Sequence, residues 1–306
     1  MDVRVPDLVR QRAEAGGDVG RAWLADLPAT LNGLAEHWEL EIGAPYIGGT
    51  AGYVTRAIRS DGTPVVLKVA APLSHEEEAT FRRSVRAHEL AAGRGCVELL
   101  AVDHDRHAMV LERLGPNLDQ AGFTVPQILD AVVDALREFW RPLPADHGLM
   151  NGAESAAWLG DFIVDLWDEL DRPCPRAVVD RALQCCTRRE AAHDPATAVL
   201  VHGDAHGWNT VIAGDGFKLV DPEGLASEPA HDLAVPMREY NAPLLAGDTA
   251  RLVRERAEYL GARADVDPEA VWQWGYIERV STGLLAIKDF EDGDADGMLE
   301  VAQRCL

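Results

Sequence analysis

Lysine, and basic residues in general, are scarce in this sequence. Its 306 residues include 29 Lys and Arg against 51 Asp and Glu, which gives a formal net charge of −22. Such a chain lacks the basic surface that binds nucleic acid or anionic membranes, so neither partner is expected. A negative field instead attracts cationic small molecules. Only three of the basic residues are lysines, which makes each lysine a candidate for a role that arginine cannot fill.

The sequence also has few cysteines and no long apolar stretch. The five cysteines show no C-x-x-C spacing, so neither a disulfide framework nor a zinc site is predicted. No run of about 18 apolar residues occurs, so no membrane span is expected. The first residues, MDVRVPDLVRQRAEAGGD, carry charges where a signal peptide needs an apolar stretch. With 47% hydrophobic residues the composition is globular, and we expect a cytoplasmic protein.

The first 114 residues show two successive patterns. Apolar residues at three- and four-residue spacing predict helices in residues 1–40. Residues 41–114 contain short apolar runs separated by turn residues, which predict five strands. Within this segment, Ser74 precedes three glutamates and is typical of a helix start, so one main helix is predicted up to about Ala92. The result is a small β-rich lobe with one helix.

Residues 115–306 have a mostly helical pattern and are predicted to form a larger second lobe. One β hairpin is expected within it, from the apolar runs 210–213 and 217–220 on either side of Gly214-Asp215-Gly216. The fold class is therefore α+β, with an N-terminal antiparallel sheet and a helical C-terminal lobe. The predicted segments are 1–40, 41–114 and 115–306.

The densest cluster of polar residues is the segment HGDAHGWN at 202–209, just before the expected hairpin. Asp204 and Asn209 have the D-x-x-x-x-N spacing of the protein-kinase catalytic loop. In that loop the Asp accepts the proton of the substrate hydroxyl, and the Asn holds Mg²⁺. Asp221 follows the second hairpin strand, so the hairpin returns it close to Asn209. We predict Asp204 as catalytic base and Asn209 and Asp221 as metal ligands, because oxygen ligands suit Mg²⁺.

A second motif lies in the β-rich lobe. Lys68 ends the strand sequence VVLK, which is similar to the V-A-I-K strand whose lysine pairs the α- and β-phosphates of ATP in kinases. One hairpin earlier, Gly49 and Gly52 flank a turn that can bring backbone N–H groups near phosphate. The order of these motifs along the chain predicts phosphoryl transfer from a nucleotide.

Several segments resemble the aminoglycoside phosphotransferases, and within them the streptomycin 6-phosphotransferase and hydroxyurea kinase group. The segments are GRAWLADLP at 20–28, DGTPVVLK at 61–68, LERL at 111–114, HGD at 202–204 and EPAHDLA at 228–234. The resemblance covers nearly the whole chain. It implies a bilobal protein-kinase-like fold, ATP or GTP as phosphate donor, Mg²⁺ as cofactor, and no protein partner.

The resemblance also implies roles for single residues. Asp204 would be the catalytic base, and Lys68 would contact the nucleotide phosphates. Glu112 and Leu114 would belong to the hinge behind the adenine, and Asp232 would tie the catalytic loop to the helical lobe.

One position departs from the family pattern. Relatives usually carry a Glu on the helix after the lysine strand, where it pairs with that lysine, and the aligned residue here is Ser84. A serine cannot neutralise an ammonium group. Glu77 lies about two helical turns earlier on the same face and could substitute for it.

The acceptor is expected to be a cationic small molecule, most of all an aminoglycoside such as streptomycin, phosphorylated on a hydroxyl. In the family the acceptor site lies in the helical lobe and is lined by carboxylates. The candidates here are Glu223, Glu278, Asp289, Glu291 and Asp292. The same motifs also permit another antibiotic, a sugar or an amino alcohol.

Two other functions stay open at this point. A catalytically weak nucleotide-binding protein on a kinase scaffold would explain Ser84. A metallohydrolase could use His202, Asp204 and His206, but it would leave Lys68 and the hinge without a role. For both histidines we favour the interpretation that they are hydrogen-bonded anchors of the loop.

Overall fold

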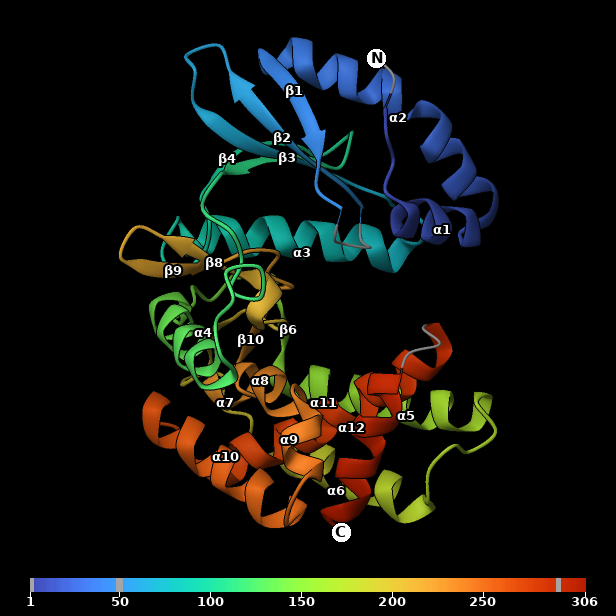
Figure 1. Cartoon of the computed structure of the whole chain (residues 1–306), viewed down its shortest axis with the longest axis vertical. Helices are drawn as coiled ribbons and strands as arrows, with labels where there is room; N and C mark the ends of the chain where they lie inside the picture. The colour runs from blue at the N-terminus through green and yellow to red at the C-terminus, as the bar shows by residue number, and fades with distance from the viewer. Residues whose placement is uncertain (1–2, 48–51, 290–292) are drawn as a thin grey trace. The chain divides into compact units, whose positions relative to one another are not determined.

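The computed structural model describes residues 3–47, 52–289 and 293–306. The chain divides into two compact units, Met1–Gly115 and Pro116–Leu306, which are drawn in Figure 1 and described separately below.

The first unit contains an antiparallel sheet of five strands in the order β1-β2-β3-β5-β4. The strands are β1 (Leu40–Pro45), β2 (Gly52–Arg59), β3 (Pro64–Ala70), β4 (Leu99–Asp103) and β5 (Ala108–Glu112). The turn between β2 and β3 is closed by Asp61, whose carboxylate accepts the N–H of Thr63 at 2.8 Å, and by Gly62 at a φ of 85°. The predicted N-terminal sheet is confirmed.

Two helices precede the sheet, α1 (Asp7–Ala15) and α2 (Gly17–His37). The leucines of α2 at 27, 31 and 34 are buried in one core with the β3 residues Val65, Leu67 and Val69. Because strand side chains alternate between faces, Lys68 lies on the opposite face of the sheet from Leu67. The core therefore occupies one face and leaves the lysine on the other.

Helix α3 (His75–Ala91) is the main helix predicted for this unit. It begins where expected, since the Ser74 hydroxyl accepts the N–H of Glu77 at 3.2 Å and satisfies one of the unpaired donors of the first turn. Its buried face carries Phe81, Ser84, Val85 and His88 at helical spacing.

The second unit is mostly helical. Its longer helices are α4 (Val125–Phe139), α5 (Gly152–Glu169), α6 (Arg176–Ala192), α10 (Thr249–Ala264), α11 (Pro268–Asp289) and α12 (Gly293–Arg304), and its short ones are α7 (Pro229–Asp232), α8 (Ala234–Arg238) and α9 (Asn241–Leu245). Helix α11 packs against α5, α6, α8, α10 and α12, and it is the central helix of this unit (Figure 1). No helix among the described residues is both long and apolar enough to span a bilayer.

The hairpin of β8 (Thr210–Ala213) and β9 (Gly216–Leu219) forms as predicted. The expectation that it is the sole β structure of this unit was wrong. A second sheet joins β6 (Met150–Asn151), β10 (Leu225–Ser227) and β7 (Val199–Val201). Its strands have two or three residues each, and they pair segments far apart in the chain, so no local pattern marks them.

Helix α12 was also not predicted. Gly293–Arg304 forms a helix that buries Met298, Leu299 and Val301.

The shared core predicts how much α2 stabilises the first unit. Leu31 is fully buried between α2 and the sheet. Leu31→Ala therefore loses the favourable free energy of moving this side chain out of water, and it leaves a cavity. We expect a loss of about 2–5 kcal/mol in the free energy of unfolding, measured by urea titration. Leu8→Ala, at a leucine that is 45% exposed on α1, is the control and should change stability by less than about 0.5 kcal/mol. Equal effects of both variants would contradict the packing of α2 on the sheet.

Candidate active site

The segment 202–209 follows β7 and is fixed by the carboxylate of Asp232 in α7. The N–H groups of His202 and Gly203 donate to the two oxygens of Asp232 at 2.8 and 2.7 Å. The indole N–H of Trp140 donates to the same carboxylate at 2.8 Å. Burial raises the pKa of Asp232 to about 6, although the three donors favour its ionised form. Asp232 therefore holds the start of the loop in place.

His202 is a second anchor of this loop. It is fully buried, and its Nε2 lies 2.9 Å from the carbonyl oxygen of Val220. Its Nδ1 accepts the N–H of Asp204 at 3.2 Å. A carbonyl only accepts and an amide only donates, so the ring is the neutral Nε2–H tautomer. Burial lowers its pKa to about 4. Both ring nitrogens are used, which leaves none for the metal ion that the metallohydrolase hypothesis requires.

Gly203 has a special role between these anchors. Its φ of +90° is strained for any residue with a side chain. A Cβ at this position would also lie 3.1 Å from the Cβ and from Oε2 of Glu223. Glu223 is held against the loop because its N–H donates to the carbonyl of His202 at 2.8 Å. The sequence H-G-D thus allows the chain to turn tightly just before Asp204.

The carboxylate of Asp204 is surrounded by donors. Its Oδ2 accepts the amide N–H of Asn209 at 3.0 Å and lies 3.3 Å from Nε2 of His206. Its Oδ1 accepts Nη2 of Arg238 at 2.9 Å. Burial acts to raise the pKa of Asp204, but the bond and charge of His206 and the charge of Arg238 outweigh it and hold the pKa well below its usual range. Asp204 is therefore ionised at neutral pH, and its side chain keeps 31% of its surface exposed.

The hairpin brings Asp221 back to the loop, as the sequence predicted. The N–H of Val220 donates to the carbonyl of Asn209 at 2.8 Å, and Asp221 is the next residue. Asp221 has a φ of 59°, a left-handed conformation that Asp tolerates better than most residues. The Asn209 amide nitrogen donates to Asp204, so its oxygen is the atom that would face a cation. Asn209 and Asp221 would offer oxygen ligands, the kind that Mg²⁺ prefers.

Arg238 was not identified from the sequence. It lies at the end of α8 with 13% of its side chain exposed, and besides Asp204 it contacts Glu278 at 2.6 Å and Glu239 at 3.4 Å. Glu278, a predicted acceptor ligand on α11, is thus one side chain away from Asp204. No motif marks Arg238, because its contacts join segments that are 34 and 40 residues away in the chain. The buried residue Pro236, two positions earlier, gives no indication of a functional site either.

The other predicted site residues of the second unit lie as follows. Asp289 ends α11, and Glu291 and Asp292 lie outside the described residues. Their role as acceptor ligands therefore remains a prediction.

The nucleotide residues predicted from the sequence belong to the first unit. Lys68 is half-buried in the middle of β3, paired in register with Val54 and Met109. Gly52 begins β2, where a Cβ would lie 2.5 Å from the carbonyl oxygen of Val69, so only glycine fits. Gly49 lies outside the described residues.

The end of β5 carries the predicted hinge. The Glu112 carboxylate accepts the N–H of Glu98 at 3.2 Å, which ties the end of β5 to the start of β4. Leu114 follows two residues later, just before the boundary of the unit at Gly115.

Ser84 and Glu77 both lie on α3, as the alignment assumed. Ser84 is buried on the inner face of the helix. Glu77, the proposed substitute for the missing family glutamate, forms an ion pair with Arg12 of α1 at 3.0 Å. One oxygen of Glu77 is therefore committed to a neighbouring helix.

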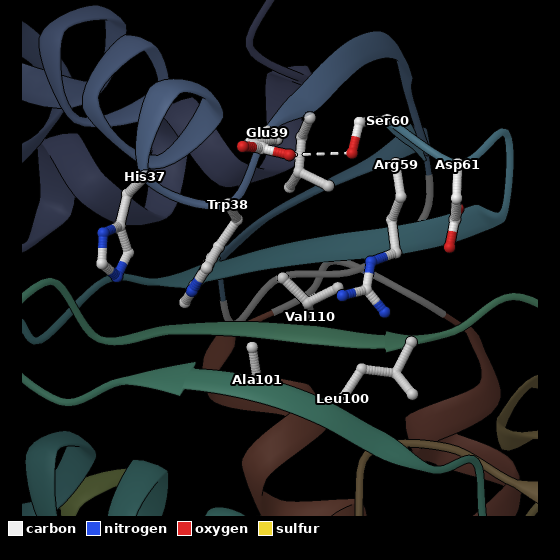
Figure 2. Close-up of a pocket in the computed structure, with 10 residues that line it drawn as sticks. His37, Trp38, Glu39, Arg59, Ser60, Asp61, Leu100, Ala101 and Val110 are labelled. Atoms are coloured by element: carbon white, nitrogen blue, oxygen red, sulfur yellow. Dashed lines mark hydrogen bonds between the residues drawn. The ribbon is translucent and has the colours of Figure 1, made fainter.

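A hollow in the first unit, shown in Figure 2, is separate from these residues. It is lined by the end of α2, by the β2–β3 turn and by β4 and β5, with Trp38, Arg59 and Val110 among its walls. Val110 is the register partner of Leu67, so the hollow lies on the α2 face of the sheet, opposite Lys68. None of the predicted site residues that the structure describes lines it.

Solved structures share this architecture. An ethanolamine kinase from Plasmodium vivax has a TM-score of 0.58 at 13% identity, covering 88% of this chain and 82% of that one. A putative fructosamine-3-kinase from Thermobifida fusca has a TM-score of 0.56 at 15% identity, covering 90% and 97%. At these identities the likeness shows the fold alone, and it confirms the kinase-like α+β fold predicted from the sequence.

The family is shown by sequence. The model of the aminoglycoside/hydroxyurea antibiotic resistance kinases matches residues 37–293, and the chain belongs to this family. A streptomycin 6-kinase of Streptomyces glaucescens is 30% identical over 96% of this chain and 93% of its own length. A hydroxyurea phosphotransferase of Kitasatospora aureofaciens is 29% identical over 99% and 86%. The protein is therefore a phosphotransferase that acts on an alcohol group, as the motifs predicted.

The buried histidines predict how stability depends on pH. His231 stacks on Trp274 with ring centroids 3.8 Å apart, and burial lowers its pKa to about 3. In the unfolded chain its pKa is about 6.5, so between these values only the unfolded state binds the proton. The contribution of neutral His231 to the free energy of unfolding is therefore complete above about pH 6.5 and is lost as the pH falls through this window. His202 acts in the same direction, whereas Asp232, with its raised pKa, opposes them between about pH 4 and 6.

We expect His231→Phe to reduce this dependence. The ring remains but cannot bind a proton, so the slope of the unfolding free energy against pH should fall by about 1.4 kcal/mol per pH unit between about pH 6 and pH 4. The measurement is urea unfolding at several pH values. His75→Gln, at a fully exposed histidine, is the control and should leave the slope unchanged. An unaltered slope in His231→Phe would show that this histidine is not held neutral.

Proposed function

We propose that the protein transfers the γ-phosphate of ATP, or of GTP, to a hydroxyl of a cationic small molecule, most of all an aminoglycoside such as streptomycin. The observation that carries this proposal is the ionised carboxylate of Asp204, held by Asn209, His206 and Arg238 and still partly exposed. The name of the relative from Streptomyces glaucescens supports the acceptor.

Asp204 acts on the acceptor. Its carboxylate orients the attacking hydroxyl and takes the hydroxyl proton as the oxygen attacks the γ-phosphorus. The new bond joins this phosphorus to the acceptor oxygen, and the bond to the β-phosphate oxygen breaks, so ADP leaves. The anchors Asp232 and His202 accept the main-chain N–H groups of residues 202–204, which keeps the base in place for this step.

Asn209 and Asp221 would hold Mg²⁺, for which their oxygen atoms are suited. The bound ion supplies positive charge that neutralises the phosphate oxygens of the nucleotide. Lys68 would contact the same phosphates, Gly49 and Gly52 would offer backbone N–H groups, and Glu112 and Leu114 would flank the adenine.

The charges near Asp204 favour a cationic acceptor. Arg238 contributes one positive charge to a cluster that contains the carboxylates of Asp204, Glu239 and Glu278. Glu223, on the surface beside Gly203, adds another carboxylate. An excess of negative charge in a partly enclosed site attracts amino and guanidino groups. Asp289, Glu291 and Asp292 are proposed to extend this surface.

The test is phosphate transfer from ATP and GTP across a panel of acceptors. The panel holds streptomycin, other aminoglycosides, hydroxyurea, a sugar and an amino alcohol, since the second relative is named for hydroxyurea. We expect transfer to one cationic acceptor and a loss of about 10²–10⁴-fold in Asp204→Asn, because the amide cannot accept the proton. Asp215→Asn, at an exposed turn residue of the β8–β9 hairpin, is the matched control and should retain full activity. An unchanged rate in Asp204→Asn would remove this residue from the mechanism.

A second candidate is a nucleotide-binding protein that transfers phosphate weakly or not at all. It is favoured by Ser84 and by the ion pair that commits Glu77 to Arg12. This candidate predicts that ATP raises the melting temperature while every acceptor stays unmodified. It also predicts that Ser84→Glu gains transfer, whereas Ser84→Gln, of similar size but neutral, does not. Efficient transfer by the unaltered protein would exclude it.

A further inference from the structure

Arg238 connects the predicted base to a second acidic side chain. Its Nη2 donates to Oδ1 of Asp204 at 2.9 Å and its Nη1 donates to Oε2 of Glu278 at 2.6 Å. Its Nε reaches Glu239 at 3.4 Å. Arg238 and Glu278 each keep only 13% of their side chains exposed, so this pair is shielded from solvent far more than an ordinary surface ion pair.

We propose that Arg238 is a positioning residue, which holds Asp204 so that its Oδ1 receives the proton of the acceptor hydroxyl. This inference rests on the proposed function, since it assumes that Asp204 is the base. It assigns different tasks to the two oxygens of one carboxylate.

The hydrogen bonds distinguish these oxygens. Each carboxylate oxygen offers about two lone pairs to donors. Oδ2 of Asp204 faces Asn209 at 3.0 Å and His206 at 3.3 Å, so both of its lone pairs have a donor within reach. Oδ1 has Arg238 as its donor, which leaves one lone pair for an incoming hydroxyl. The acceptor is therefore expected to approach from the Oδ1 side.

Glu278 determines how Arg238 meets Asp204. An arginine fork often binds a carboxylate through two parallel N–H groups, and such a pairing would occupy both oxygens of Asp204. Here Glu278 takes Nη1, so only Nη2 is directed at Asp204. Lysine could not reproduce this arrangement, because its ammonium group lacks the planar fork that reaches two carboxylates in fixed directions.

The main chain at Arg238 is itself fixed by two other arginines. Arg256 donates to the carbonyl of Glu239 at 2.6 Å, and Arg279 donates to the carbonyl of Arg238 at 3.2 Å. Arg279 also donates to the carbonyl of Met237. The backbone of residues 237–239 is thus held by side chains from α10 and α11, which gives the guanidinium group of Arg238 a rigid base.

The experiment compares Arg238→Ala with the unaltered protein, using the acceptor identified by the panel above. A displaced base slows the chemical step without affecting the binding of either substrate. We expect kcat to fall about 10²-fold while both KM values stay within about threefold. Guanidinium chloride at millimolar, non-denaturing concentration should restore part of kcat in this variant, and sodium chloride at equal ionic strength should not. Arg238→Lys retains the charge, and we expect it to fold and to have an intermediate kcat.

Arg189→Ala is the matched control. Arg189 is buried to a similar degree, with 12% of its side chain exposed, and it pairs with Glu228 at 3.2 Å without contacting Asp204. It should lower the melting temperature without the specific loss of kcat and without rescue by guanidinium. The positioning role is overturned if kcat of Arg238→Ala and Arg238→Lys falls only in proportion to their melting temperature. It is also overturned if kcat/KM falls because KM rises while kcat is unchanged. Absence of transfer by the unaltered protein would instead overturn the proposed function.

Discussion

The position of the segment 202–209 depends on one buried carboxylate. Asp232 accepts the N–H groups of two consecutive residues, His202 and Gly203, and the indole N–H of Trp140. Without this acceptor, two backbone N–H groups at a tight turn would be buried without partners, which costs about 1–3 kcal/mol for each. Because the turn is fixed, His202 can bond both the N–H of Asp204 and the carbonyl at the end of β9. The placement of Asp204 and of the hairpin therefore follows from Asp232.

Buried arginines hold the segment of the chain that contributes Arg238 to the surroundings of Asp204. Arg238 bridges carboxylates, whereas Arg279 is almost fully buried and donates to backbone carbonyls and to Asn241. Burial lowers the pKa of Arg279 to about 9, so it still carries its charge at neutral pH. Several donors in one planar group allow a single side chain to satisfy several carbonyls. The segment that contains Arg238 is therefore held in place by another arginine.

Most of the helices and strands could be predicted because their signals are local. Ser74 with its following glutamates marks the start of α3, and Asp61-Gly62 marks the turn between β2 and β3. Prediction failed where the stabilising contacts are distant. The three-stranded sheet pairs Leu225 with Met150 and Val201, and α12 buries apolar residues behind a run of acids. The pairing of these strands has no pattern that a window of neighbouring residues contains.

The sequence by itself determined the class of protein and the residues of the loop. Residue order alone contains three features typical of phosphoryl transfer. They are the spacing of Asp204 and Asn209, the hairpin that returns Asp221, and the VVLK strand. Only the tertiary structure decided which side chains surround the carboxylate of Asp204. Arg238 and Glu278 come from α8 and α11, and their contact with Asp204 depends on how these helices pack. A motif within one segment can be recognised from residue order, but the donors around a carboxylate depend on how several distant segments pack together.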